Sequence, residues 1–264
     1  MDTAYTSFAS TYDTFMSNVP YEEWAERIDE LIKKYNELNI PEGDETLASE
    51  AGLLVDLGCG TGVLTRLMAD KGYDCIGIDL SEQMLEVAME HETEKRILYL
   101  NQDMRSFELY STVGNIISVC DSINYLLEDD DLLSCFKCVN NYLYPRGLFI
   151  FDFNTDHNYA SIGDDTIAEN SEEGSFIWEN YYDSDSRINE YDLTLYTKDA
   201  DGRYIRSEET HTQRGYTADE IISLVRQAGL EVITFFDSDT GSEPDEETCR
   251  IVVVAREVTK PLPE

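Results

Sequence analysis

The segment VDLGCGTGVL, residues 55–64, carries the strongest evidence for the fold. It begins inside the apolar run Leu53–Leu57, which predicts a buried strand, and it carries three glycines, Gly58, Gly60 and Gly62, ahead of a helical pattern. A strand, a glycine-rich turn and a helix in this order are typical of the ligand-binding end of a parallel α/β sheet. The stretch therefore predicts a nucleotide lying against bare backbone and leaves open which nucleotide it is.

Downstream of this turn, short apolar runs alternate with helical patterns, which predicts an α/β fold with a doubly wound, mostly parallel sheet of seven strands. The predicted strands are Leu53–Leu57, Cys75–Leu80, Ile97–Leu100, Ile116–Cys120, Gly147–Phe153 and a closing hairpin of Glu231–Phe236 and Ile251–Ala255. The predicted helices are Val63–Lys71, one that starts after Ser81, Asp130–Leu143 and Ala218–Ala228.

A different pattern interrupts this alternation after the fifth strand. Polar and apolar residues alternate along Ser175–Tyr182, Arg187–Thr197 and Tyr204–Gln213, which predicts antiparallel strands with one solvated face. We therefore expect a single domain over residues 1–264, in which a helical lead-in or lid (1–45) precedes the core and an inserted antiparallel sheet (160–216) covers the acceptor site.

The composition argues against polyanionic partners. The chain has 55 acidic and 19 basic residues and a formal net charge of −36, a balance that a halophilic source could also produce. Because nucleic acids and anionic lipids are bound through Lys and Arg, a polynucleotide or membrane partner is disfavoured. The first residues carry no basic segment and no long apolar run, so a cytoplasmic protein is expected. Cys135 and Cys138 form one C-x-x-C without a second pair, so no metal site is predicted.

Two residues of the opening stretch argue against a dinucleotide. The dinucleotide pattern G-x-G-x-x-G would place its third glycine where Val63 stands, and the glycine falls one position early, at Gly62. Asp56, at the end of the first predicted strand, would repel a pyrophosphate. A nicotinamide-dependent oxidoreductase is therefore the disfavoured alternative, and a ligand that is positively charged and lacks phosphate is favoured.

S-adenosylmethionine is such a ligand. A carboxylate at the end of the second strand can accept hydrogen bonds from both ribose hydroxyls, and Asp79 stands there. An acidic residue at the end of the third strand can accept one from the adenine amino group, and Asp103 occupies that place. Three acidic strand ends in order predict a methyl-donor site.

The chain resembles the class I S-adenosylmethionine-dependent methyltransferases in VDLGCGTG, IGIDLSEQML and NQDMRSF. In CDSINYL (120–126), FDFNT (151–155) and ETHTQRGY (209–216) it is similar to a small-molecule subgroup that includes amino-sugar N,N-dimethyltransferases. The resemblance implies in-line SN2 transfer from S-adenosyl-L-methionine, leaving S-adenosyl-L-homocysteine. It implies a donor site formed by Tyr12, Trp24, Asp56, Gly58, Cys59, Gly60, Asp79, Leu80, Met84, Asp103, Met104 and Cys120, with core packing as the alternative for Trp24.

The resemblance also implies three acceptor-side residues. Asp121 would lie near the reacting sulfur, Tyr125 would line the acceptor pocket or pack there, and His211 would serve as a base or stand on a solvated sheet face. A small amine is the expected acceptor. A hydroxyl or carboxylate acceptor and a non-catalytic S-adenosylmethionine-binding protein remain alternatives. A monomer and a homodimer are both compatible with the sequence.

Overall fold

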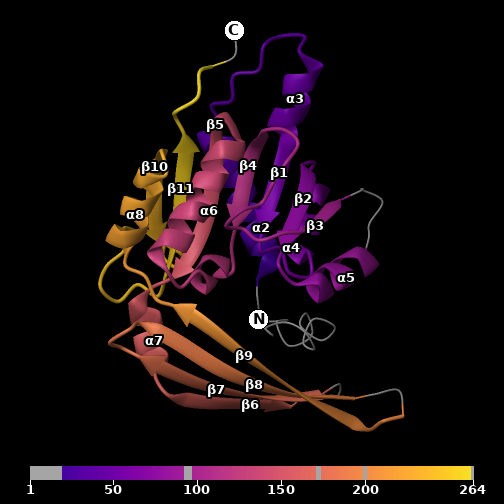
Figure 1. Ribbon diagram of the computed structural model, residues 1–264, viewed down its shortest axis with the longest axis vertical. Helices are drawn as coiled ribbons and strands as arrows, with labels where there is room; N and C mark the ends of the chain where they lie inside the picture. Colours follow the sequence, from indigo (N-terminus) through magenta and orange to yellow (C-terminus); the bar gives the residue numbers. More distant parts are fainter. Residues whose placement is uncertain (1–19, 92–96, 171–173, 199–200, 263–264) are drawn as a thin grey trace.

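The computed structural model describes residues 20–91, 97–170, 174–198 and 201–262. Its main sheet has seven strands in the order β10-β11-β5-β4-β1-β2-β3 (Figure 1). The strands are β1 (Leu53–Leu57), β2 (Asp74–Asp79), β3 (Leu98–Asn101), β4 (Val113–Ser118), β5 (Leu143–Asn154), β10 (Leu230–Asp237) and β11 (Arg250–Glu257). β11 runs antiparallel to both of its neighbours and the other pairs are parallel. The predicted mostly parallel, doubly wound sheet is confirmed, and so is its closing hairpin.

Helices cover both faces of this sheet. The helices are α2 (Tyr21–Tyr35), α3 (Glu45–Gly52), α4 (Val63–Asp70), α5 (Glu82–Glu90), α6 (Asp129–Tyr142), α7 (Asp156–Ile162) and α8 (Ala218–Gln227). Residues of α6 and α8 pack with Phe149, Phe151 and Phe153 of β5 in one hydrophobic cluster. Residues of α2 and α4 pack with Leu148 and Ile150 of the same strand in a second cluster. The alternation along β5 thus buries both of its faces, as a central strand requires.

A second sheet of four antiparallel strands lies beyond the carboxyl ends of the parallel strands (Figure 1). Its strands are β6 (Asp165–Asn170), β7 (Gly174–Asp183), β8 (Ile188–Lys198) and β9 (Tyr204–Arg214). The inserted antiparallel sheet is confirmed. Its ends meet at the core, where Thr155 pairs with Tyr216 and the buried Asn124 side chain donates to the carbonyls of Asn154 and Arg214.

Four local predictions are corrected by the structure. β4 ends at Ser118 rather than at Cys120, because Cys120 has a φ of 58°, in the left-handed region, and cannot continue the strand. β5 starts at Leu143, and an unpredicted helix, α3, follows the loop that ends at Asp44. The inserted sheet has the additional edge strand β6, all of whose residues are exposed.

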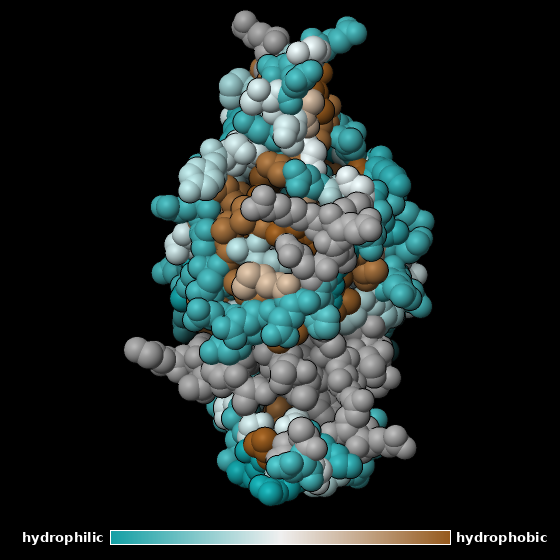
Figure 2. All heavy atoms as spheres, turned by 90° about the vertical axis from the view of Figure 1, so that its right-hand side faces the viewer, coloured by the Kyte–Doolittle hydropathy of each residue, from teal (hydrophilic) through white to brown (hydrophobic). Residues whose placement is uncertain are grey.

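Of the predicted helical lead-in (1–45), residues 1–19 lie outside the described residues. Within the remainder, α2 buries Ala25, Ile28, Leu31 and Ile32. None of the helices within the described ranges is long and apolar enough to cross a membrane. On the side of the molecule shown in Figure 2, hydrophilic residues cover most of the described surface, in keeping with the 55 acidic residues of the chain.

Candidate functional site

The glycine turn between β1 and α4 has the close backbone contacts that its sequence predicts. The N–H groups of Gly58 and Cys59 both donate to the carbonyl of Ile78 at the end of β2, at 2.8 and 3.1 Å. Gly58 has a φ of +74°, and a Cβ there would lie 2.6 Å from Ser122 Oγ. Only glycine fits this position, because both the left-handed backbone and the close approach of Ser122 exclude a side chain.

The Asp79 carboxylate connects the end of β2 to this turn. Its Oδ2 accepts a hydrogen bond of 2.8 Å from the Gly60 N–H, and its Oδ1 accepts one of 2.8 Å from the Ser81 N–H. Burial raises the pKa of Asp79, and these backbone donors oppose the rise. The carboxylate is thus fixed beside the glycine turn, where the sequence places the ribose.

Asp56 lies deeper, under the turn. Its side chain is 3% exposed and accepts a 2.6 Å hydrogen bond from Oγ1 of Thr65, which lies in the first turn of α4. Burial raises the pKa of Asp56 to about 7, and the neighbouring Asp79 adds to the rise. A buried carboxyl poised in this way is stabilised as an anion by any cation that enters beside it.

Asp103 lies at the far end of the site and is held by Arg105. The Arg105 guanidinium donates to Asp103 Oδ1 at 3.0 Å and to Oδ2 at 2.6 Å, and it also reaches Asp131 at 3.0 Å. The hydrogen bond from Arg105 lowers the pKa of Asp103, so this carboxyl is ionised and able to accept a hydrogen bond. Arg105 is the only Lys or Arg among the described residues that line the cavity.

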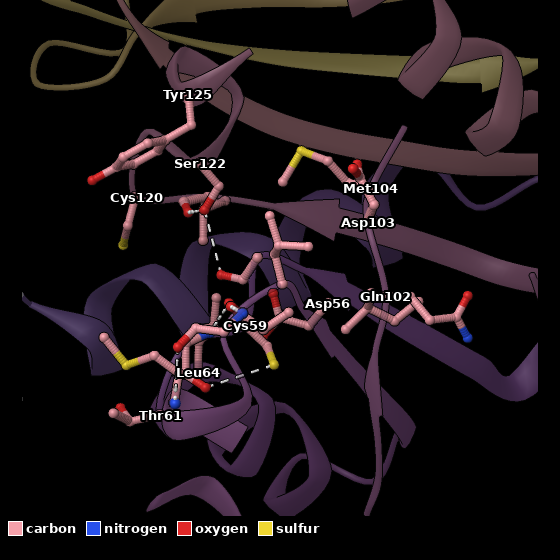
Figure 3. A pocket seen from close by; sticks show the side chains of 18 of the residues that line it. Asp56, Cys59, Thr61, Leu64, Gln102, Asp103, Met104, Cys120, Ser122 and Tyr125 are labelled. Atoms are coloured by element: carbon pink, nitrogen blue, oxygen red, sulfur yellow. Dashed lines mark hydrogen bonds between the residues drawn. The ribbon is translucent and has the colours of Figure 1, made fainter. Parts of the chain in front are cut away.

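These groups surround a cavity of about 310 Å³ at the carboxyl end of β1, β2 and β4 (Figure 3). Figure 3 shows Cys120, Ser122 and Tyr125 on one side of it and Gln102, Asp103 and Met104 on the other. The cavity is lined by ten of the predicted donor residues: Asp56, Gly58, Cys59, Gly60, Asp79, Leu80, Met84, Asp103, Met104 and Cys120.

The two remaining predicted donor residues lie elsewhere. Tyr12 is outside the described residues. Trp24 packs against the hydrophobic cluster of α2 and α4, with the Arg27 guanidinium 5.9 Å from its ring centre, and is not among the described residues that line the cavity. Tyr21, one turn earlier on α2, lines it instead. These contacts agree with the packing alternative, and the donor role of Trp24 stays a prediction.

His211 is buried, which overturns the solvated-face alternative. Its side chain is 1% exposed, and its ring stacks on Tyr191 with centres 4.7 Å apart. Nδ1 of His211 lies 3.1 Å from the Tyr125 hydroxyl, and Nε2 lies 3.5 Å from the equally buried Glu209 carboxylate. Because Tyr125 also lines the cavity, it connects the donor cavity to the inserted sheet.

Asp121 is placed differently from a free base. Its Oδ1 pairs with Arg250 Nη2 at 2.7 Å, and its Oδ2 accepts a 2.8 Å hydrogen bond from Gln213 Nε2. Arg250 also pairs with the buried Asp152 at 2.6 Å. Both Asp121 oxygens are thus engaged. Local sequence patterns do not indicate these partners, because Arg250 is 129 and Gln213 is 92 residues away.

Other lining residues were missed at the sequence level. Tyr21, Ser122 and Gln102 line the cavity, and Ser122 Oγ donates to the Val119 carbonyl at 3.1 Å. Ser122 is the third residue of CDSINYL (120–126). Its position just after the fourth predicted strand is the signal by which it could have been predicted. Of the C-x-x-C pair, Cys135 packs in the core and Cys138 Sγ donates to the Phe107 carbonyl at 3.1 Å.

The donor set of the cavity fits S-adenosylmethionine. Asp56 and Asp79 are carboxyls at its floor, and a Cβ added to Gly60 would meet open space. Leu80 is 61% exposed and offers an apolar surface to an aromatic base. The one Lys or Arg of the described lining, Arg105, is already paired with Asp103 and Asp131, so the lining offers a pyrophosphate no unpaired Lys or Arg.

The comparisons with known proteins agree with this chemistry. A family model described as a methyltransferase domain matches residues 54–147. The chain is 32% identical over 255 residues to the YqeM protein of Bacillus subtilis (strain 168), which is named as a methyltransferase, and the match covers 96% of both chains. The chain belongs to the S-adenosylmethionine-dependent methyltransferases and is an enzyme that uses this methyl donor.

Two solved structures are similar to the whole fold. An S-adenosylmethionine-dependent methyltransferase of Clostridium acetobutylicum has a TM-score of 0.82 and 26% identity, with 96% of this chain and 99% of that chain covered. CalS10 of Micromonospora echinaspora, an amino pentose methyltransferase, has a TM-score of 0.67 and 17% identity, with 94% and 97% covered. The second likeness shows the fold alone.

Proposed function

We propose that this enzyme methylates an amine nitrogen of a small molecule that binds between the donor cavity and the inserted sheet. The observation that carries the proposal is the contact between Tyr125, which lines the cavity, and the buried His211. The proposal assigns the donor side to the cavity residues described above and the acceptor side to Tyr125, His211 and their neighbours.

A proton route for an amine is built into this contact. An amine reaches the enzyme largely as an ammonium ion and must lose a proton before its nitrogen can attack. Glu209 beside Nε2 favours the His211 tautomer that carries its proton on Nε2, so that the Nδ1 lone pair accepts a hydrogen bond from the Tyr125 hydroxyl. As Tyr125 passes its hydroxyl proton to His211 Nδ1, its oxygen can take the proton of the acceptor ammonium, and Glu209 stabilises the imidazolium that forms.

Charge around the site also favours a cationic acceptor. Asp56, Asp79 and Glu209 are carboxyls of the cavity or its neighbourhood, and the chain carries a net charge of −36. Such a field concentrates ammonium ions and repels carboxylates. Bound S-adenosylmethionine supplies a methyl group already activated by the positive sulfur, so once the amine is neutral the protein mainly orients its lone pair and excludes water.

The inserted sheet is the element we assign to covering the acceptor. Trp178 of β7, Tyr191 of β8 and His211 of β9 stack across three strands, with ring centres 4.3 and 4.7 Å apart. CalS10 is named as an amino pentose methyltransferase and has a similar fold, which supports a small acceptor that carries an amine.

Release of S-adenosylhomocysteine from pairs of acceptors that differ only in NH₂ against OH tests this function. We expect transfer to the amine members and none to the hydroxyl members. Transfer to the hydroxyl members alone would overturn the proposal and favour the O-methyltransferase alternative. The same assay with His211→Gln shows whether the transfer uses the proposed proton route.

A further inference from the structure

The end of β4 has a strained backbone next to the donor cavity. Cys120 and Asp121 are consecutive non-glycine residues with φ values of 58° and 55°, in the left-handed region. Cys120 and the following Ser122 both line the cavity. Strained residues of this kind persist only where the surrounding structure holds them in place, and they cluster at functional sites.

A network of charged hydrogen bonds holds this turn from the side away from the cavity. Asp152 Oδ1 accepts the Asp121 backbone N–H at 3.0 Å, and Asp152 Oδ2 pairs with Arg250 Nη1 at 2.6 Å. The second terminal nitrogen of Arg250 pairs with the Asp121 side chain at 2.7 Å, and Gln213 donates to the remaining Asp121 oxygen at 2.8 Å. The backbone and the side chain of Asp121 are therefore both fixed.

The sheet places the guanidinium where it can bridge the two carboxylates. Asp152 pairs with Val252 in the register of β5 and β11, so Arg250 stands two residues further along the neighbouring strand. Asp152 has no exposed surface, so its charge requires this partner. The planar fork of arginine can contact two carboxylates at once with fixed geometry, which a lysine ammonium cannot reproduce.

We propose that Arg250, together with Asp152, is a positioning residue of the donor site. The pair holds the Cys120–Asp121 turn in its left-handed conformation, and the turn in its place forms the wall of the cavity opposite Asp103 and Met104 (Figure 3). Asp121 is the residue through which Arg250 and Asp152 hold the turn in place, and it does not act as a base. This role depends on the donor site and not on the identity of the acceptor.

Isothermal titration of S-adenosylmethionine and of S-adenosylhomocysteine into the Arg250→Lys variant tests the proposal. We expect the Kd of both ligands to rise at least tenfold while the protein remains folded. Arg187→Lys is the matched control, because Arg187 also has a left-handed backbone (φ 59°) and a two-point ion pair, with Glu220 at 2.7 and 2.5 Å, away from the cavity. Its Kd values should stay within twofold of the parent, even if its melting temperature falls as much as that of the Arg250→Lys variant.

Asp121→Asn is the second variant, should Arg250→Lys fail to fold. Asparagine tolerates the left-handed conformation and leaves the backbone bond to Asp152 in place, but it loses the ion pair with Arg250. We expect a three- to tenfold rise in both Kd values. Parental affinity for both ligands in whichever variant folds would overturn the proposal and leave the network a purely structural role.

Discussion

The Asp79 side chain accepts a hydrogen bond from the Gly60 N–H at 2.8 Å, which joins the end of the second strand to the turn that leaves the first. This one contact brings together the two parts of the donor site that lie at the carboxyl ends of neighbouring parallel strands, β1 and β2. A single side chain therefore both shapes the glycine turn and presents a carboxylate beside it.

Replacing Asp79 by alanine should weaken S-adenosylmethionine binding by about 1.5–3 kcal/mol, the usual size of hydrogen bonds to a charged group. Isothermal titration measures the change. Asp74→Ala, at the exposed start of the same strand, is the control and should leave the affinity unaltered. Equal affinity in the Asp79→Ala variant and the parent would contradict the placement of the ribose at Asp79.

Asp56 should make both folding and donor binding depend on pH. Its pKa is raised from 3.8 to about 7 by burial, so the folded state keeps this proton after the unfolded state has lost it. The free energy of unfolding therefore falls as the pH rises from about 4 to about 7, and the loss is complete above that range. Asp56→Asn removes this loss and should be more stable than the parent at pH 8, on the order of 2–4 kcal/mol.

The same substitution should impair binding of the cationic donor. The parental affinity should rise with pH through about 7 as Asp56 ionises, and the variant should lack that rise. Denaturant unfolding and titration of the ligand, each at pH 5, 6, 7 and 8, measure the two effects. Parallel curves for parent and variant would show that Asp56 does not titrate in this range.

His211→Gln should lower turnover about 100-fold, within the range of lost general base catalysis, while the affinity for S-adenosylmethionine stays within about twofold. The reason is that His211 contacts Tyr125 and Glu209 but does not itself line the donor cavity among the described residues. His91→Ala, at an exposed position after α5, controls for loss of an imidazole elsewhere. Unchanged turnover in His211→Gln would remove this histidine from the chemistry.

Tyr125→Phe tests whether Tyr125 and His211 act as one unit. The substitution removes the hydroxyl that lies 3.1 Å from His211 Nδ1 and 2.9 Å from the Tyr191 hydroxyl. Turnover should fall about 100-fold, as in His211→Gln. The double variant should be no slower than either single variant, because residues of one route are not additive. Multiplicative losses would show two independent roles.

Gly58→Ala should destabilise the protein by about 1–3 kcal/mol and weaken donor binding at least tenfold, through a left-handed backbone and overpacking. The added methyl would lie 2.6 Å from Ser122 Oγ and 2.7 Å from Ser122 Cβ. Gly52→Ala, at the end of α3, meets nothing within 4 Å and should have little effect. Thermal unfolding and titration of S-adenosylmethionine compare the two variants. Equal stability and affinity in both would contradict the close approach of Ser122 to Gly58.

The donor side of the site could be predicted because its determinants are local in sequence. Asp56, Gly58 and Asp79 lie at the ends of two short apolar strands, and parallel strands bring such ends to one edge of the sheet. The two-residue alternation along β9 likewise predicts that Ser207, Glu209, His211 and Gln213 share a face. Ser207 is half-buried and the other three are buried.

The remainder depends on contacts that local patterns do not contain. Nothing near Asp121 indicates Arg250, since the pair forms only when the antiparallel register of β5 and β11 sets it. The left-handed conformation of Cys120 could not be predicted, because Cys120 ends the run Ile116–Cys120, whose composition predicts a strand throughout. The edge strand β6 has six exposed residues and therefore lacks the alternation by which strands are recognised.

The pairing of Thr155 with Tyr216 has a consequence for how this enzyme can diversify. Because the two ends of the inserted segment lie side by side, the segment between them can change in length or sequence without pulling the core strands apart. The methyl donor and its carboxylates stay with the core, whereas the aromatic stack of Trp178, Tyr191 and His211 travels with the insertion. If the inserted sheet covers the acceptor as proposed, exchanging residues 156–215 between relatives should transfer acceptor preference together with that segment.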